Sequence, residues 1–342
     1  MKRNKSNKDN KAVIYWLLSG CLLIFIMVIV GGITRLTDSG LSISNYKLIT
    51  GTIPPIGEQE WQEAFELYKQ YPEYQKLNSH FTIEDFKSIY FWEWLHRVIG
   101  RTIGLVFIVP FIYFLIRKKL TKNTIKKCIV LLALGGFQGF LGWYMVKSGL
   151  VDMPDVSHFR LAAHLITAFI TFAATLWVAL DLIYPNRKPT NKPMKKYIII
   201  GYSILILQII YGAFVAGLKA GLLHNHWPLM NDGKFIHFTA YVLEPFYKNL
   251  IENPSGIQFV HRTLAYLVVI SMILIWHKSK QYNLTTLQQK GVNSLVILVF
   301  VQFILGVFTI LLQVPLWLGV AHQIGAFFLL SAMTFTLHRF AK

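Results

Sequence analysis

Four histidines occupy the same kind of position in this chain, each in the first turn of a long apolar segment. Four residues after each histidine stands a glycine or an alanine, so the same helix face carries no bulky side chain one turn further on. A haem bound through its iron needs such a gap, because the edge of the porphyrin must pass the helix backbone. Paired histidines are also the donors for axial ligation of haem iron. The four motifs are His96 with Gly100, His164 with Ala168, His261 with Ala265, and His322 with Ala326.

Two simpler explanations account less well for these histidines. A single histidine in a membrane helix often does no more than hydrogen-bond to a neighbouring helix, but four with the same small neighbour are hard to explain in that way. A zinc site is disfavoured, because the histidines lie on different segments with no cluster of cysteine or aspartate beside them. The spacing therefore predicts two haem sites, each held by two histidines.

The segment around His96 carries further groups that could do chemistry. Glu93, His96, Arg97 and Arg101 fall within nine residues, although a basic or aspartate side chain costs roughly 2.5–3.5 kcal/mol at the centre of a bilayer. Helical spacing places Glu93, His96 and Arg97 on one face. The equivalent of Glu93 in the second half of the chain is Gln258. A carboxylate one turn from an iron ligand in only one half predicts that this half does the chemistry, with Glu93 as the catalytic residue.

Two arginines, Arg97 and Arg262, directly follow histidines of the motif. We expect them to bind haem propionates that point towards the outer side of the membrane, because arginine pairs well with carboxylates. The alternative is that such a side chain only reaches out to the membrane interface, which is a fair explanation for Arg101 as well.

The elements that must position these residues are eight apolar segments of about 20 residues, the length needed to cross about 30 Å of hydrocarbon. The chain of 342 residues is 54% hydrophobic, with a mean hydropathy of +0.46. Segments this long indicate helices, because a membrane barrel would show alternating strands of about ten residues. We therefore expect an all-α polytopic membrane protein. The predicted spans are Val13–Ile33, Tyr90–Ile116, Ile125–Val146, Phe159–Ile183, Tyr197–Leu218, Phe259–Trp276, Val292–Leu312 and Trp317–Leu337.

The second half of the chain repeats the first, with four predicted spans in each. The stretch Glu93–Arg97 corresponds to Gln258–Arg262, and Gln138–Gly142 in the third span corresponds to Gln302–Gly306 in the seventh. An even number of spans per repeat preserves orientation, so the halves should be two four-helix bundles related by a pseudo-twofold axis along the membrane normal. The bundles are expected at residues 1–184 and 185–342.

The net charge of +18 is distributed in a way that predicts orientation and argues against nucleic-acid binding. Basic residues gather at both termini and in the loops Arg117–Lys127, Arg187–Lys196 and Lys278–Lys290, whereas most acids lie in the other loops. By the positive-inside rule both termini are cytoplasmic. Every even-numbered span then enters from outside, so both haem sites should lie towards the outer face.

Local signals predict how the spans begin, end and pack. The first helix should end within Gly31–Gly40, where glycine and hydroxyl residues break it into the first outer loop. In the outer loop that follows, Glu58–Gln70 reads as a short amphipathic helix, and Thr82–Asp85 as a capping box that launches the second span. The third span should pack closely through its small residues, Gly135, Gly136, Gly139 and Gly142.

The remaining histidines and the cysteines are expected outside the haem sites. His224 and His226 could line the mouth of a site, whereas the other outer-loop histidines should be solvated and His338 should lie at the basic membrane interface. Cys21 and Cys128 fall within spans and are predicted to be small core residues. The first apolar segment has no small-residue cleavage site and the N-terminus lacks an Arg-rich amphipathic pattern, which favours a bacterial inner membrane.

With these residues in view, the sequence resembles the haem A synthase family, in particular its longer-loop branch of proteobacteria and mitochondria. The resemblance rests on Gly31–Ser42, Gly51–Pro55, Glu93–Arg97 and the other three histidines, and it covers nearly the whole chain. It implies two four-helix bundles and an enzyme that oxidises the C8 methyl group of haem O to a formyl group, giving haem A for cytochrome oxidase. The outer loops lack the cysteine pairs of some bacterial members, so no thiol step proposed for those members applies here.

The resemblance also implies a role for each candidate residue and a set of partners. The expected partners are haem O, the lipid bilayer, a haem O synthase and an electron acceptor. By position, His261 and His322 match the ligands of a haem b cofactor with Arg262 beside them, His96 and His164 match the substrate site with Arg97 beside them, and Glu93 matches the family's essential glutamate.

Two other classes of protein share some of these features. A bis-histidine cytochrome that exchanges electrons with quinone would bind haem in both halves and would tolerate replacement of Glu93. A transporter would also contain repeats and charges within the membrane, but the purified protein would lack the Soret absorbance of haem.

Overall fold

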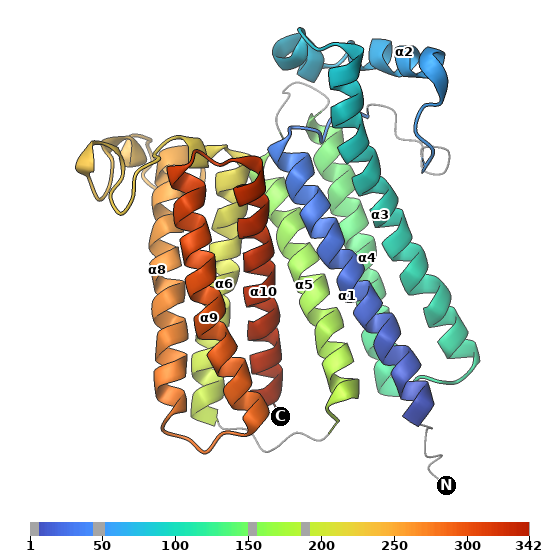
Figure 1. The fold of residues 1–342 in the computed structure, drawn as a ribbon, viewed down its shortest axis with the longest axis vertical. Coiled ribbons are helices and arrows are strands. Elements are labelled where there is room, and N and C mark those ends of the chain that lie inside the picture. The colour runs from blue at the N-terminus through green and yellow to red at the C-terminus, as the bar shows by residue number, and fades with distance from the viewer. Residues whose placement is uncertain (1–6, 44–51, 150–155, 186–191, 342) are drawn as a thin grey trace.

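The fold is built from long helices that agree with the predicted spans. The structure, a computed structural model, describes residues 7–43, 52–149, 156–185 and 192–341, and within them the regular elements are all helical. In this described part of the chain, eight helices are long and apolar enough to cross a membrane (Figure 1). These are α1 (Asn7–Leu36), α3 (Ile83–Ile116), α4 (Lys122–Gly149), α5 (His158–Ile183), α6 (Lys192–Gly217), α8 (Pro254–Ser279), α9 (Thr286–Leu311) and α10 (Leu316–Phe340).

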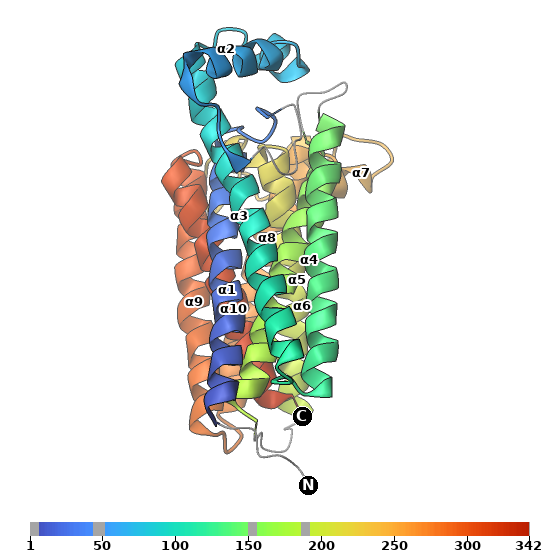
Figure 2. The ribbon, with the colours of Figure 1, turned by 90° about the vertical axis from the view of Figure 1, so that its right-hand side faces the viewer.

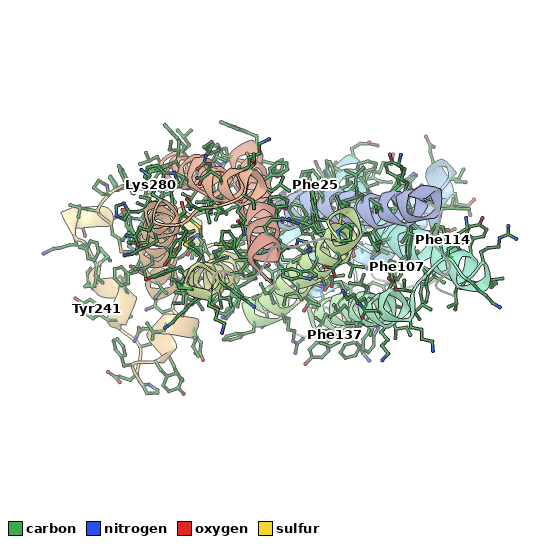
Figure 3. The ribbon with its side chains drawn as sticks, turned by 90° about the horizontal axis from the view of Figure 1, so that it is seen from below. Phe25, Phe107, Phe114, Phe137, Tyr241 and Lys280 are labelled. Atoms are coloured by element: carbon green, nitrogen blue, oxygen red, sulfur yellow. The ribbon has the colours of Figure 1, made fainter. Side chains whose placement is uncertain are left out.

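The spans form one continuous structure. Helices α6, α8, α9 and α10 lie on one side of the molecule and α1, α3 and α4 on the other, while α5 contacts α6 and α10 as well as α1 and α4 (Figure 1). One buried cluster contains Cys21 of α1, Phe169 of α5 and Met272 of α8. Phe25 of α1 also contacts Phe327 of α10, with ring centroids 4.9 Å apart (Figure 3). The two halves of the sequence therefore share a hydrophobic core.

Short helices cover the end of the molecule opposite to the termini (Figures 1 and 2). The first outer loop contains α2 (Gly57–Tyr68), which confirms the predicted amphipathic helix. Its Phe65 and Tyr68 are buried against Phe86 and Ile89 of α3. The other short elements are a π-helix (Tyr74–Asn78), α7 (Lys248–Ile251) and 3-10 turns at Ala220–Leu222, Asn231–Gly233 and Phe238–Tyr241.

Two of the helices that carry histidines begin at caps that precede their apolar segments, so the histidines lie further from the helix start than expected. The predicted capping box is present, because the Thr82 hydroxyl accepts from the Asp85 amide and the Asp85 carboxylate accepts from the Thr82 amide. Asn253 caps α8 in the same region. The placement of the histidines in first helical turns was wrong. His96 lies more than three turns into α3, and the other three lie about two turns into their helices, because the helices begin before the apolar residues do.

Helix α1 ends at Leu36, within the Gly31–Gly40 segment in which we expected it to end. Its Gly32 permits a close contact, because a methyl group added there would overlap Oε1 of Gln323 on α10. The close packing expected of the glycine strip in α4 was wrong, because methyl groups on Gly135, Gly136 and Gly139 would meet no described atom within 4 Å. Of that strip, Gly142 alone makes a close contact with a described residue, His164. Phe137, next to Gly136, is exposed at the periphery of the molecule (Figure 3).

The end of the molecule that holds the termini contains a buried polar contact which the sequence did not suggest. His338 of α10 is fully buried, and its Nε2 lies 3.0 Å from the Asp181 carboxylate of α5. Lys127 of α4 pairs with the same carboxylate. His338 is therefore part of a contact that joins three helices near the basic end of α10, and its place at the membrane interface stays a prediction.

Candidate functional site

Each of the four histidine rings rests against a glycine of a neighbouring helix. A methyl group placed on any of these glycines would come within about 3 Å of the ring, so a larger residue would displace the imidazole. The distances from the added carbon to Cε1 are 2.9 Å for Gly31 and His96, 3.1 Å for Gly142 and His164, 3.2 Å for Gly212 and His261, and 2.8 Å for Gly306 and His322.

Space remains beside all four histidines. Each histidine and the small residue four positions later keep part of their surface accessible, although the surrounding helices are packed. His96 lies in the group of α1, α3, α4 and α5 with His164, whereas His261 lies with His322 in the group of α6, α8, α9 and α10.

Each pair of histidines offers two nitrogen ligands, which suits a metal that is already bound by a cofactor such as a porphyrin. Among the described residues, no group of three or more His, Cys, Asp or Glu side chains could hold a bare metal ion. The Nδ1 atoms of His96 and His261 are buried and lack a hydrogen-bond partner in the described chain. Each site therefore offers two histidines, and each histidine has a glycine or an alanine one turn further along its helix. Some of their imidazole nitrogens have no hydrogen-bond partner. These features fit a haem, which itself supplies four further nitrogen ligands to its iron.

Glu93 is buried in the first site and holds the start of the loop between α1 and α3. Its carboxylate accepts hydrogen bonds from the Ser42 hydroxyl at 2.6 Å, from the Ile43 amide at 2.8 Å and from Arg97 at 2.5 Å. Arg97 also donates to the Ile43 carbonyl at 3.0 Å. We call Ser42, Ile43, Glu93 and Arg97 the first clamp. Its carboxylate, that of Glu93, is buried one turn before His96 in α3.

A second clamp occupies the equivalent place in the other half. Gln258 donates to the carbonyl of His224 at 3.1 Å, and Arg262 donates to the same carbonyl at 2.6 Å. Arg262 also reaches the Leu229 carbonyl at 3.3 Å. Each clamp therefore uses the residue three before a histidine and the arginine one after it to hold the backbone of an outer loop. Binding of haem propionates by these arginines remains a prediction.

Two histidines of the loop between α6 and α8 are buried, namely His224, which we placed at the mouth of a site, and His237, which we expected in solvent. His224 is 5% exposed, its Nε2 lies 2.7 Å from the Ser255 hydroxyl, and its ring packs on that of His237. His237 in turn contacts the carboxylate of Asp232 at 3.0 Å. His226 is exposed and lies 2.9 Å from Asn231. Nothing in the local sequence separates these neighbours, because the partners of His224 in α8, Ser255, Gln258 and Arg262, lie more than 30 residues away.

The burial of His224 predicts a dependence of stability on pH. Burial, assisted by nearby His237 and Arg262, lowers the pKa of His224 from 6.5 to about 4, against an opposing effect of Asp232. Because the folded pKa is depressed, stability is full above pH 6.5 and is lost as the pH falls towards about 4. We expect the midpoint of thermal unfolding to fall over this interval, and His224→Gln to reduce that dependence.

The exposed neighbour provides the matched control for this measurement. His226→Gln changes a histidine two positions away that lies at the surface, so it should leave the pH dependence of the midpoint as it is in the parent protein. Equal slopes for the parent, His224→Gln and His226→Gln would show that His224 does not control acid stability.

Comparisons with known proteins agree over almost the whole chain. Residues 14–334 match the COX15-CtaA family, which is described as cytochrome oxidase assembly protein. The chain is 63% identical over 340 residues to a protein named heme A synthase from Flavobacterium johnsoniae, covering 98% of this chain and 99% of that protein. It is 42% identical over 338 residues to the heme A synthase of Parvibaculum lavamentivorans, with 99% and 97% covered, and 41% identical over 334 residues to that of Wolbachia pipientis, with 96% and 93% covered.

Proposed function

Because the chain belongs to the COX15-CtaA family of cytochrome oxidase assembly proteins, we propose that it is the enzyme that converts haem O into haem A. The names of the relatives do not favour the bis-histidine cytochrome as an alternative. One structural observation supports the proposal. The two histidine sites are similar, but in the described part of the chain the first has a buried carboxylate, Glu93, one turn from its histidine, whereas the second has Gln258 there.

We assign the two sites to different haems. His96 and His164, with Arg97, would hold the substrate haem O, because Glu93 is in this half. His261 and His322, with Arg262, would hold a haem b cofactor, which supplies electron transfer when it is bound. The bundles at residues 1–184 and 185–342 would then be a substrate half and a cofactor half, related by a pseudo-twofold axis.

The protein's own groups would position the substrate and manage protons. Conversion of a methyl group to a formyl group adds one oxygen atom and removes hydrogen, so an electron acceptor must take electrons and protons must leave the substrate site. Glu93 could accept such a proton or stabilise positive charge near the reacting methyl group. The first clamp would hold Glu93 in place, since Ser42 and Ile43 donate to its Oε2 while Arg97 balances its charge. The same clamp would hold the outer loop against the site and limit access of water.

Analysis of extracted haems tests the proposed activity. Cells that make haem O should form haem A only when they also express this chain, and the mass of the product should show a formyl group in place of a methyl group. Equal amounts of haem A with and without the chain would refute the proposal. The further partners we propose are a haem O synthase and an electron acceptor.

The eight apolar helices and the bacterial relatives indicate a multi-pass membrane protein of bacteria. We propose that it lies in the inner membrane with both termini in the cytoplasm. Ser79 is exposed at the end opposite to the termini, whereas Lys122 is exposed at their end (Figure 1). Ser79→Cys should therefore react with an impermeant maleimide in intact spheroplasts, and Lys122→Cys only after lysis. The native Cys21 and Cys128 are buried and should give little background. The reverse labelling pattern would invert the topology.

A further inference from the structure

The residue one helical turn before each of the four glycines that contact a histidine ring lies on the same face of its helix. It is a glutamine in three of the four helices and a methionine in the fourth. The pairs are Gln138 and Gly142 in α4, Gln208 and Gly212 in α6, Gln302 and Gly306 in α9, and Met27 and Gly31 in α1.

The three glutamines contact the histidines that face them. The side-chain nitrogen of Gln302 lies 3.1 Å from Nδ1 and 3.4 Å from Nε2 of His322, and that of Gln208 lies 3.4 Å from Nε2 of His261. The side-chain nitrogen of Gln138 lies 3.1 Å from Nδ1 and 3.3 Å from Nε2 of His164, and it also donates to the main-chain carbonyl of His164 at 3.0 Å. In all three glutamines the Oε1 atom is buried and has no hydrogen-bond partner in the described part of the chain. Both histidines of the second half thus have an unused acceptor within reach, whereas Gln138 holds His164 through its backbone as well.

Such an acceptor matters when an imidazole binds a metal. A histidine that ligates iron through one nitrogen carries a proton on the other, and it almost always donates that proton to an oxygen. A rotation about the last side-chain bond exchanges the amide oxygen and nitrogen of glutamine, which are assigned from the hydrogen-bond network. Gln208 and Gln302 can therefore support both ligands of the second half, whereas Gln138 supports only one ligand of the first.

His96 is the histidine without this support. Met27 occupies the glutamine position, and its terminal carbon lies 3.3 Å from a methyl group built on Gly100. A thioether sulfur is only a weak acceptor. The buried Nδ1 atoms of His96 and His261 both lack a hydrogen-bond partner among the described residues, but His261 has Gln208 at its other ring nitrogen. The side chain at the glutamine position of α1 lies near Gly100, one turn from His96, and offers no oxygen.

We propose that Met27 makes His96 a releasable ligand, and that the glutamines are positioning residues which anchor the other three histidines. This inference rests on the proposed function, in which the first half exchanges substrate for product and the second half retains its cofactor. A haem held between two supported histidines leaves slowly, whereas one supported ligand and one unsupported ligand allow release after each reaction. The difference between Met27 and the glutamines thus divides the two similar sites into one for exchange and one for retention.

Methionine and glutamine have nearly the same length, so exchanging them tests the acceptor with little change in volume. In the second half, Gln302→Met should speed transfer of the resident haem from the purified protein to apomyoglobin by about 10–100-fold, the usual effect of losing such a partner. The reduction potential of that haem should rise, because a less basic imidazole stabilises ferric iron less. Gln302→Glu keeps an acceptor oxygen and should retain the haem.

In the first half the opposite exchange should have the opposite effect. With haem O as the probe, Met27→Gln should slow transfer to apomyoglobin and lower the reduction potential, whereas Met27→Leu, which keeps the bulk but adds no acceptor, should release haem O as fast as the parent. Equal release from Met27→Gln and Met27→Leu, or retention of haem by Gln302→Met, would overturn the inference. Formation of haem A by the parent protein, measured separately, decides the proposed function independently of these release rates.

Discussion

Replacing His261 or His322 with alanine should remove the tightly held haem from the purified protein, while the protein still inserts into the membrane. Each substitution deletes an iron ligand but leaves the helix intact, because alanine is the best helix former. The remaining histidine cannot complete the axial pair. A reduced absorbance spectrum and a pyridine haemochrome assay of the purified variants would give the haem content. Full haem b content in both variants would remove the cofactor assignment.

Two sets of controls separate loss of a ligand from general damage. His226→Ala removes an exposed histidine of the same half and should retain the haem, as should His96→Ala in the substrate half. Gly306→Val leaves every ligand in place but adds a side chain where the first carbon alone would lie 2.8 Å from the ring of His322. It should lower haem content, whereas Gly139→Val in α4, which meets no described atom, should not.

The spans and the histidine motif could be predicted because their signals are local. Eight apolar segments of sufficient length have no other stable arrangement in a bilayer than helices. The capping box at Thr82 and the amphipathic pattern of α2 depend only on residues within a few turns. The gap next to each histidine also follows from a fixed spacing along one helix, and the structure keeps part of the surface accessible at each of these positions.

The clamps and the buried outer histidines could not be predicted, because their partners are far apart in the sequence. Glu93 bonds to Ser42 and Ile43, about 50 residues earlier, and no spacing rule connects them. The glutamine supports were partly visible, since Gln138 and Gln302 occur in matching segments. Gln208 was missed because the equivalent residue of the first half is Met27, so the repeat does not reveal it, and only the packing of α6 on α8 shows that it faces a histidine.

Glu93→Gln should abolish formation of haem A while the protein remains folded and still binds haem O. The substitution gives the first half the residue that the second half has at Gln258. An amide keeps the shape and can still accept from Ser42 and Ile43, but it has neither the charge nor the ability to take up a proton. Loss of a general base lowers rates by about 10²–10⁴-fold, so haem A should fall to a trace and haem O or a partly oxidised intermediate should accumulate.

The first clamp supplies the competing explanation, namely that Glu93 only holds Arg97 and the outer loop. Ser42→Ala distinguishes the two roles, because it removes one hydrogen bond to the carboxylate and leaves its charge and its partner Arg97 in place. If Glu93 acts on the reaction, Ser42→Ala should retain most haem A formation and Glu93→Gln almost none, at equal protein level and haem content. If Glu93 only closes the clamp, both variants should lose protein or bound haem together with activity. Near-normal haem A formation in a folded Glu93→Gln protein would exclude a catalytic role for this carboxylate.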